Sequence, residues 1–347
     1  MGREGKGDYV IFEGRRAERL DNGRVRVTVL AGGGHIAEMG LVDGGVNPLW
    51  KPPWPTLEPR EYDPSRHAEY GSGPEARLLA GIMGHNLCFD FFGGPSEEEA
   101  GAGLTVHGEA SVADWDLRRR GGEELTATAE LPLAGMRVER RLTLAPGAQE
   151  VHITETVENL SAADRPVGWT QHVTLGPPFL AAGRTTLDIP ATRSKVFETD
   201  FAEGKGRMRT GAEFDWPMCP GVDGGSIDLR VASDAAISAG YTAHLLNPAI
   251  EEAWFTATNP DLGVAFGYRW RRADFPWIGI WEENRARGHS PWNGRTLTRG
   301  MEFGVSPMPE TRRQMVDRGS LFGVPSFRWI PARARVTVKY RAWIGRI

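Results

Sequence analysis

The sequence has little cysteine, no excess of charge and no long apolar run. Its two cysteines, Cys88 and Cys219, are typical of a reduced, cytoplasmic protein rather than a disulfide scaffold. No apolar stretch approaches the length of about 18 residues that predicts a membrane span, and the first residues, MGREGKGDYVIFEGRR, lack the apolar centre of a signal peptide. The net charge of -4 gives no basic surface for nucleic acid. We therefore expect a cytoplasmic protein without a membrane or nucleic-acid partner.

Several cofactor and catalytic motifs are missing too. The sequence has no G-x-S-x-G nucleophile turn and no Cys or His pair at zinc-binding spacing. The segment AGGGHIA (31–37) loosely matches a dinucleotide-binding loop, but that motif needs a following helix and a parallel partner strand, and neither pattern is present. We expect no cofactor and no metal. One alternative stays open, a metal held by distant His and Glu residues.

Strand patterns dominate what is present. The 44 glycines, 24 prolines and 12 tryptophans, with few helical patterns, indicate an all-β protein. With no repeat and no linker, we predict a single domain over residues 1–347, a large antiparallel β-sandwich in which 95–103 could form one helical turn and 310–319 a short helix. Apolar and polar residues alternate, as they do in half-buried strands, over 24–30, 137–144, 150–159, 226–232, 263–270 and 335–343.

One long segment fits no pattern. The stretch WKPPWPTLEPREYDPSRHAEYGSGPEA (50–76) is rich in proline and lacks periodicity. A loop of this length inside a compact protein is either functional or poorly ordered.

Three polar residues stand in otherwise apolar strand patterns. His107 precedes Gly108 at the end of an alternating run, and His172 shares one strand face with Thr170 and Thr174. Glu302 lies between two apolar residues in RGMEFGVSPMPE (299–310), just before a turn. Each could be a simple structural residue, since buried polar groups are usually just hydrogen-bonded and most exposed carboxylates are only solvated.

The segment DFPWIGIWEENRARGHSPWNGR (274–295) combines aromatic residues with polar residues whose side chains can make two parallel hydrogen bonds. An aromatic ring can stack on the CH face of a sugar, and the hydroxyls of the sugar can bind side chains that make two hydrogen bonds at once. The candidates here are Trp281, Glu282, Trp292 and Arg295. The alternative is that these tryptophans belong to the core of a large sandwich.

These motifs, in this order, resemble the galactose mutarotase-like (aldose 1-epimerase) superfamily, in a less characterised branch. The resemblance runs from the strand at 24–30 to the C-terminal strand, and rests on HG at 107–108, VEN at 157–159, WTQH at 169–172 and GMEFGVSP at 300–307. It implies a supersandwich of many antiparallel strands with a sugar cleft on one concave face.

The resemblance also implies roles for the three polar residues. Glu302 would remove the proton from the anomeric hydroxyl, His172 would protonate the ring oxygen, and His107 would bind and polarise the sugar. Two hydrogen bonds to either side of one acetal would place Glu302 and His172 roughly 5–8 Å apart. The expected substrate-binding residues are His85, Asn86, Trp281, Glu282, Trp292 and Arg295.

The chain also departs from the family pattern. The segment GIMGHNLCFDFFGG (81–94) has no arginine where typical sugar epimerases have one. A clear match to the family's sugar-binding aspartate is absent, and Glu282 or Asp274 are the only substitutes that we identify. The substrate is therefore not expected to be simply galactose, although its identity stays open. A phosphate on it would have Arg285, Arg287 or Arg295 to bind it.

The sequence leaves three functions open. The first is an aldose 1-epimerase-type isomerase that interconverts the anomers of a sugar or sugar derivative. The second is a carbohydrate-binding protein that kept the cleft and lost turnover. The third, the sandwich domain of a polysaccharide-processing enzyme, is weakened because no helical catalytic domain is present. The expected partner is a small-molecule sugar substrate, and the chain is expected to be a monomer or homodimer.

Overall fold

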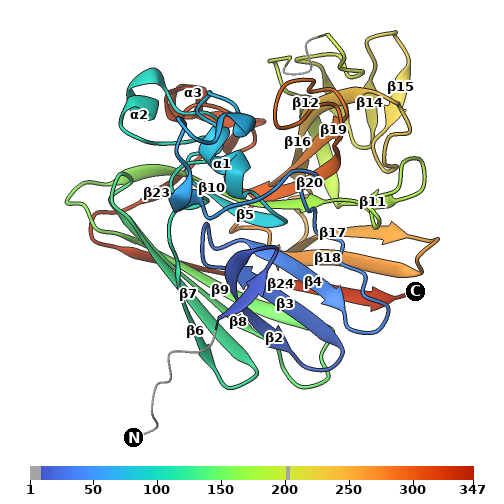
Figure 1. Ribbon diagram of the computed structural model, residues 1–347. Coiled ribbons are helices and arrows are strands. Elements are labelled where there is room, and N and C mark those ends of the chain that lie inside the picture. Colours follow the sequence, from blue (N-terminus) through green and yellow to red (C-terminus); the bar gives the residue numbers. More distant parts are fainter. Residues whose placement is uncertain (1–8, 201–203) are drawn as a thin grey trace, which may run out of the picture.

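Two large antiparallel sheets pack against each other in the computed structural model, which describes residues 9–200 and 204–347 (Figure 1). The chain is 46% strand and 7% helix, which confirms the prediction of an all-β sandwich with very little helix. The first half of the N-terminal stretch considered above lies outside the described residues. Among those described, no helix has both the length and the apolar character needed to cross a membrane.

The larger sheet has twelve strands and carries the candidate site. β23 (Arg328–Ile330) pairs with the start of β10. The other strands, in spatial order, are β1 (Val10–Phe12), β2 (Arg15–Asp21), β3 (Val25–Leu30), β4 (Ile36–Leu41), β5 (His85–Asp90), β10 (Arg165–Leu175), β20 (Leu297–Gly304), β19 (Trp277–Asn284), β16 (Ser238–Leu246), β12 (Ala191–Val196) and β13 (Glu213–Asp215).

The second sheet has eight strands. It contains the predicted hairpin, in which β8 and β9 pair from Met136 opposite Asn159 to Thr143 opposite His152. The last strand, β24, lies between β18 and β9 and is thus held on both sides, as its position near the C-terminus suggested. In spatial order the strands are β11 (Thr186–Asp188), β17 (Glu252–Asn259), β18 (Val264–Arg271), β24 (Arg335–Arg346), β9 (Glu150–Asn159), β8 (Met136–Thr143), β7 (Glu124–Leu131) and β6 (Asp116–Arg120).

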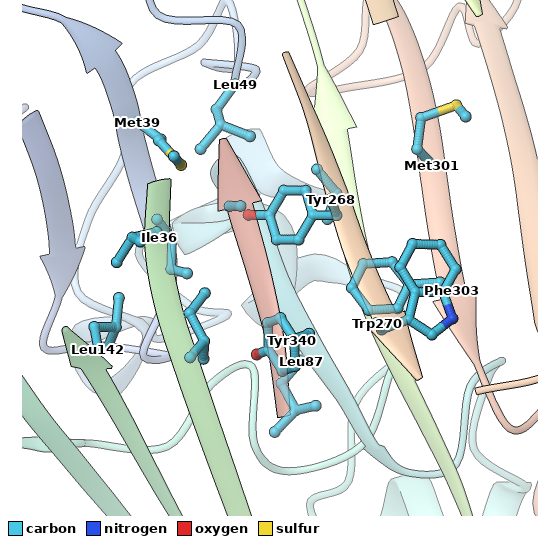
Figure 2. Packing of buried hydrophobic residues seen from close by; sticks show 14 of the residues in the cluster. Ile36, Met39, Leu49, Leu87, Leu142, Tyr268, Trp270, Met301, Phe303 and Tyr340 are labelled. Carbon is cyan, nitrogen blue, oxygen red and sulfur yellow. The ribbon is translucent and has the colours of Figure 1, made fainter. Parts of the chain in front are cut away.

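The main hydrophobic core fills the space between the two sheets. Figure 2 shows Met301 and Phe303 of β20 in this core, with Phe303 against Trp270 of β18. The Phe303 and Trp270 rings stack with centroids 4.1 Å apart. Burying one large apolar side chain contributes roughly 1.5–3 kcal/mol, so this packing fixes β20 firmly to the second sheet.

The helices and minor strands lie outside the two sheets (Figure 1). The two predicted helical segments are confirmed as α2 and α3. Thr311 caps α3 in a reciprocal capping box and Gly319 ends it. The remaining elements are η1 (Pro59–Glu61), η2 (Ala68–Tyr70), α1 (Ala76–Gly81), α2 (Glu97–Gly101), β14 (Met218–Pro220), β15 (Ser226–Asp228), α3 (Arg312–Arg318), β21 (Ser320–Leu321) and β22 (Val324–Pro325).

The proline-rich segment is built into the protein rather than loose. Residues 50–84 fold over the outer face of the twelve-stranded sheet and form a second apolar cluster with it. The Trp54 indole donates to the Leu79 carbonyl at 2.9 Å, and the Tyr70 hydroxyl donates to the Pro55 carbonyl at 2.9 Å. Because this cluster sits on the face opposite the main core, the twelve-stranded sheet is buried on both sides there.

Candidate active site

Three polar side chains form a row across the centre of the twelve-stranded sheet. His172 of β10 lies directly opposite Asn86 of β5 on one side and Glu302 of β20 on the other. Residues directly opposite each other in an antiparallel pair point to the same face. The row therefore projects from the outer face, which we call the site face, while Met301 and Phe303 point into the core.

His172 and Glu302 are in direct contact. Nε2 of His172 and Oε1 of Glu302 are 3.1 Å apart, and both side chains are almost fully buried. Oε1 nevertheless has no hydrogen-bond partner of acceptable geometry, so it lies close to the ring nitrogen but off its bonding direction. This distance is shorter than the 5–8 Å expected for a pair with a sugar between them. A sugar held between the two groups would have to separate or redirect them.

His107 completes a cluster around His172. Their ring centroids are 4.9 Å apart. His107 Nδ1 donates to the Phe92 carbonyl oxygen at 2.6 Å, which fixes its tautomer because a carbonyl can only accept. His107 has a left-handed backbone with φ of 69°, and Gly108 follows at 77°. A side chain on Gly108 would collide with the Phe89 carbonyl, so glycine is required where this turn meets β5.

Glycine also makes room for the Glu302 carboxyl group. A side chain at Gly300, two residues earlier on the same face, would collide with Oε1 of Glu302 and press on Trp281. The carboxyl group thus lies back over Gly300, whose cross-strand partner is Trp281. The Trp281 and His172 rings are 5.9 Å apart, so the indole forms one wall of the cluster.

Burial makes charge costly at this cluster. It raises the pKa of Glu302 well above its usual value. It lowers the pKa of His172 well below its usual value, with a smaller contribution from His107. The pKa of His107 falls to about 4, chiefly through burial. The His172–Glu302 pair therefore favours an uncharged arrangement in which its one shared proton sits on the carboxyl group.

Two segments cover the site face, and we call them together the tryptophan cover. They are residues 50–84 and the β19–β20 connection, residues 285–296. Trp292 stacks on Trp50 with centroids 6.2 Å apart and meets Trp54 edge-on at 5.1 Å. It also meets Trp281 edge-on at 6.1 Å. The buried Trp292 Nε1 has no hydrogen-bond partner, so the closed cover leaves a donor unsatisfied.

The 285–296 connection is folded mainly on itself. Glu283 Oε1 accepts from the backbone of Ala286 at 2.7 Å and of Arg287 at 3.1 Å, which anchors the first turn. The Arg287 guanidinium lies over the Trp292 ring at 4.6 Å and reaches Glu75 at 3.8 Å across the seam between the two segments. The contacts across this seam are thus made largely by side chains, which can separate without breaking a strand ladder.

Not every predicted binding residue joins this group. His85 points into the main core, where it contacts the Tyr268 hydroxyl at 3.0 Å and Gln171 at 2.9 Å. Glu282 also faces away from the site face and forms ion pairs with Arg207 and Arg299, each at 2.8 Å. Arg295 is exposed.

The physical reason for the first two placements is strand alternation. His85 and Asn86 are neighbours on one strand, as are Trp281 and Glu282, so only one of each pair can reach the site face. Arg295 lies on the cover instead, and its guanidinium contacts the Pro291 carbonyl of its own loop at 3.5 Å.

Sequence reasoning missed other residues of the site. Tyr241 of β16 lies over Gly279, which stands opposite Glu302, and its hydroxyl donates to the Pro307 carbonyl at 2.9 Å. Trp50 and Trp54 belong to the aperiodic segment, and no motif marked them. The only signal was that this long segment contains aromatic residues.

No metal site accompanies the cluster. Within residues 9–200 and 204–347, no group of three or more His, Cys, Asp or Glu side chains is placed to hold a metal ion. The polar atoms of the row instead suit hydrogen bonding to an uncharged, hydroxyl-rich ligand. Both side-chain atoms of Asn86 are buried without a partner, which leaves two donor hydrogens and one acceptor oxygen for such a ligand.

Solved structures resemble this chain over nearly its whole length. A galactose mutarotase-like protein from Clostridium acetobutylicum matches with a TM-score of 0.64 at 12% identity, covering 98% of each chain. A galactose mutarotase related enzyme from Lactobacillus acidophilus matches at 0.62 and 13% identity, covering 95% of this chain and 97% of the other. The chain has the galactose mutarotase-like fold.

A third match fits the same fold. A Klebsiella pneumoniae protein provisionally named an aldose 1-epimerase has a TM-score of 0.66 at 11% identity, covering 95% of this chain and 79% of its own. No protein-family profile and no curated protein sequence matches the chain. The galactose mutarotase-like fold is therefore established by structure, while the chemistry must be argued from the site.

Proposed function

We propose that the protein interconverts the anomers of an aldose or sugar derivative by acid/base-catalysed ring opening. The observation that carries this proposal is the row of Asn86, His172 and Glu302 on one sheet face, with the acid and base candidates 3.1 Å apart. The galactose mutarotase-like fold of the chain supports it, as do the names of the neighbouring structures.

The proposed reaction uses the pair in its charged arrangement. The Glu302 carboxylate takes the proton of the anomeric hydroxyl, and the His172 imidazolium gives its Nε2 proton to the ring oxygen as the bond from that oxygen to C1 breaks. The resulting aldehyde rotates and the ring closes on its other face, which returns both protons. The resting and reacting pairs hold the same single proton, so substrate binding only has to shift it from Glu302 to His172.

The other residues of the cluster would bind the sugar. Asn86 offers its unpartnered amide to the hydroxyls, and His107 Nε2 accepts from another while Nδ1 stays bonded to Phe92. Trp281 and Trp292 supply flat apolar faces for the sugar ring. The sugar reaches the row when the tryptophan cover opens, because the catalytic pair is buried and in contact in the closed form.

The proposal is tested by adding the protein to a panel of anomerically pure sugars and following anomer exchange by polarimetry and NMR. We expect at least one aldose to equilibrate faster than in buffer, and Glu302→Gln and His172→Gln to remove the acceleration. A non-catalytic carbohydrate-binding protein is the second candidate, favoured by the direct contact within the pair. It would bind a sugar, detected by calorimetry, without accelerating exchange of any sugar in the panel.

A further inference from the structure

Thr174 is the polar neighbour of the catalytic pair that has no assigned role. It lies two residues after His172 on β10 and therefore on the same face, and it is buried. Its hydroxyl Oγ1 is 3.0 Å from Nδ1 of His172, on the opposite side of the ring from Glu302. The imidazole is thus held between a hydroxyl and a carboxyl group.

The direction of the Thr174 hydrogen bond follows from the proton held by the pair. If His172 is charged and Glu302 is a carboxylate, Nδ1 carries hydrogen. If Glu302 holds the proton, a hydrogen on Nε2 would be buried without an aligned acceptor, because Oε1 lies off its bonding direction, whereas a hydrogen on Nδ1 meets the Thr174 oxygen. In both arrangements Nδ1–H donates and the Thr174 oxygen accepts.

We propose that Thr174 is a positioning residue that holds His172 in the Nδ1–H tautomer, so that Nε2 faces Glu302 and the sugar ring oxygen. This inference rests on the proposed function for its effect on catalysis. The tautomer itself can be measured without any substrate. Burial raises the pKa of Glu302, which agrees in direction with a proton held by the pair.

Substituting Thr174 separates this role from packing. Thr174→Val keeps the shape but removes the acceptor, so an Nδ1–H would be buried without a partner and the ring should move its hydrogen to Nε2. Thr174→Ser keeps the hydroxyl. Thr170→Val is a matched control, because Thr170 lies on the same strand and face and its buried hydroxyl has no hydrogen-bond partner.

The decisive measurement is ¹⁵N NMR of the histidine rings, with His172 assigned by loss of its signals in His172→Gln. We expect the Nδ1–H tautomer in the parent protein, in Thr174→Ser and in Thr170→Val, and the Nε2–H tautomer in Thr174→Val. An Nε2–H tautomer in the parent, or an unchanged tautomer in Thr174→Val, overturns the proposal.

Kinetics on an accepted sugar supply the second readout. Thr174→Val should lower kcat by about 10- to 100-fold with KM within about threefold, the usual effect of leaving one buried donor unpaired in the reacting state. Thr174→Ser and Thr170→Val should stay near the parent. If no sugar is turned over by the parent protein, the proposed function fails while the tautomer result still decides the role of Thr174. If Thr174→Val shifts the tautomer but leaves kcat unchanged, Thr174 does not position the acid.

Discussion

Glu302→Gln removes the proposed base while keeping the shape of the side chain. Glutamine keeps the shape that fits over Gly300 but cannot accept the anomeric proton. General acid–base catalysis is worth about 10²–10⁴-fold, so anomer exchange should slow by that factor, which corresponds to about 2.7–5.4 kcal/mol in activation free energy. Sugar affinity, measured by calorimetry, should change little. An unchanged exchange rate on a sugar that the parent protein accepts would return Glu302 to a structural role.

The same variant should change the pH dependence of stability. Because burial in the folded protein raises the pKa of Glu302 above its usual value of 4.5, the folded state keeps a proton that the unfolded state releases. That contribution is fully present below about pH 4.5 and is lost as pH rises through the folded pKa, at about 1.4 kcal/mol per pH unit.

Glutamine does not titrate, so Glu302→Gln should gain free energy of unfolding over the parent as pH rises, in urea melts. Glu251→Gln is the control, because Glu251 is exposed at a turn of the second sheet. Parallel stability curves for the parent and Glu302→Gln would refute the assigned burial cost.

Three further predictions test the row, the cover and the core. Asn86→Leu removes a buried amide without partners, so the free energy of unfolding should rise by about 1–3 kcal/mol in urea melts while sugar turnover falls. Cys88 lies buried beneath the tryptophan cover, so local opening of the cover should let a thiol reagent label it in a Cys219→Ser background. We expect sugar to slow this labelling and low concentrations of urea to change its rate little. Strongly urea-dependent labelling would mean that only global unfolding exposes Cys88. Burial lowers the pKa of His244 to about 3, so the folded protein holds this histidine neutral where the unfolded chain would protonate it. The free energy of unfolding is therefore lost as pH falls from about 6.5 toward the folded pKa. His244→Gln should reduce this loss by about 1.4 kcal/mol per pH unit.

Strand alternation decided how much of the site could be read from the sequence. It correctly sent Met301 and Phe303 into the core and Glu302 to the other face, because the period of a strand is two residues. The same rule, applied to adjacent residues, shows that Asn86 can share a face with His172 only if His85 does not. Both His85 and Asn86 were predicted to bind the substrate. Only the register between β5 and β10, which pairs Asn86 with His172, shows that Asn86 is the one on the site face.

The cover could not be predicted because no local rule describes it. Trp50 and Trp54 come from an aperiodic segment, and they meet Trp292 from a loop that lies more than two hundred residues later in the chain. Their contacts depend on how two long connections cross the sheet, which neither propensity nor periodicity reports. The distance between His172 and Glu302 was missed for a related reason, since the estimate assumed a sugar held between them.

Burial of the pair links the cover to the chemistry. In water, His172 and Glu302 would each be hydrated and the ion pair would gain little. Beneath the tryptophan cover, burial raises the pKa of Glu302 and lowers the pKa of His172, so the arrangement with the proton on the carboxyl group is favoured over the ion pair. In the proposed reaction, a sugar that enters would supply hydroxyl and ring oxygens as hydrogen-bond partners for the charged arrangement, and Thr174 would accept from Nδ1–H. On this proposal the substrate itself brings the acid and base into their reactive forms, and burial beneath the tryptophan cover favours their neutral forms.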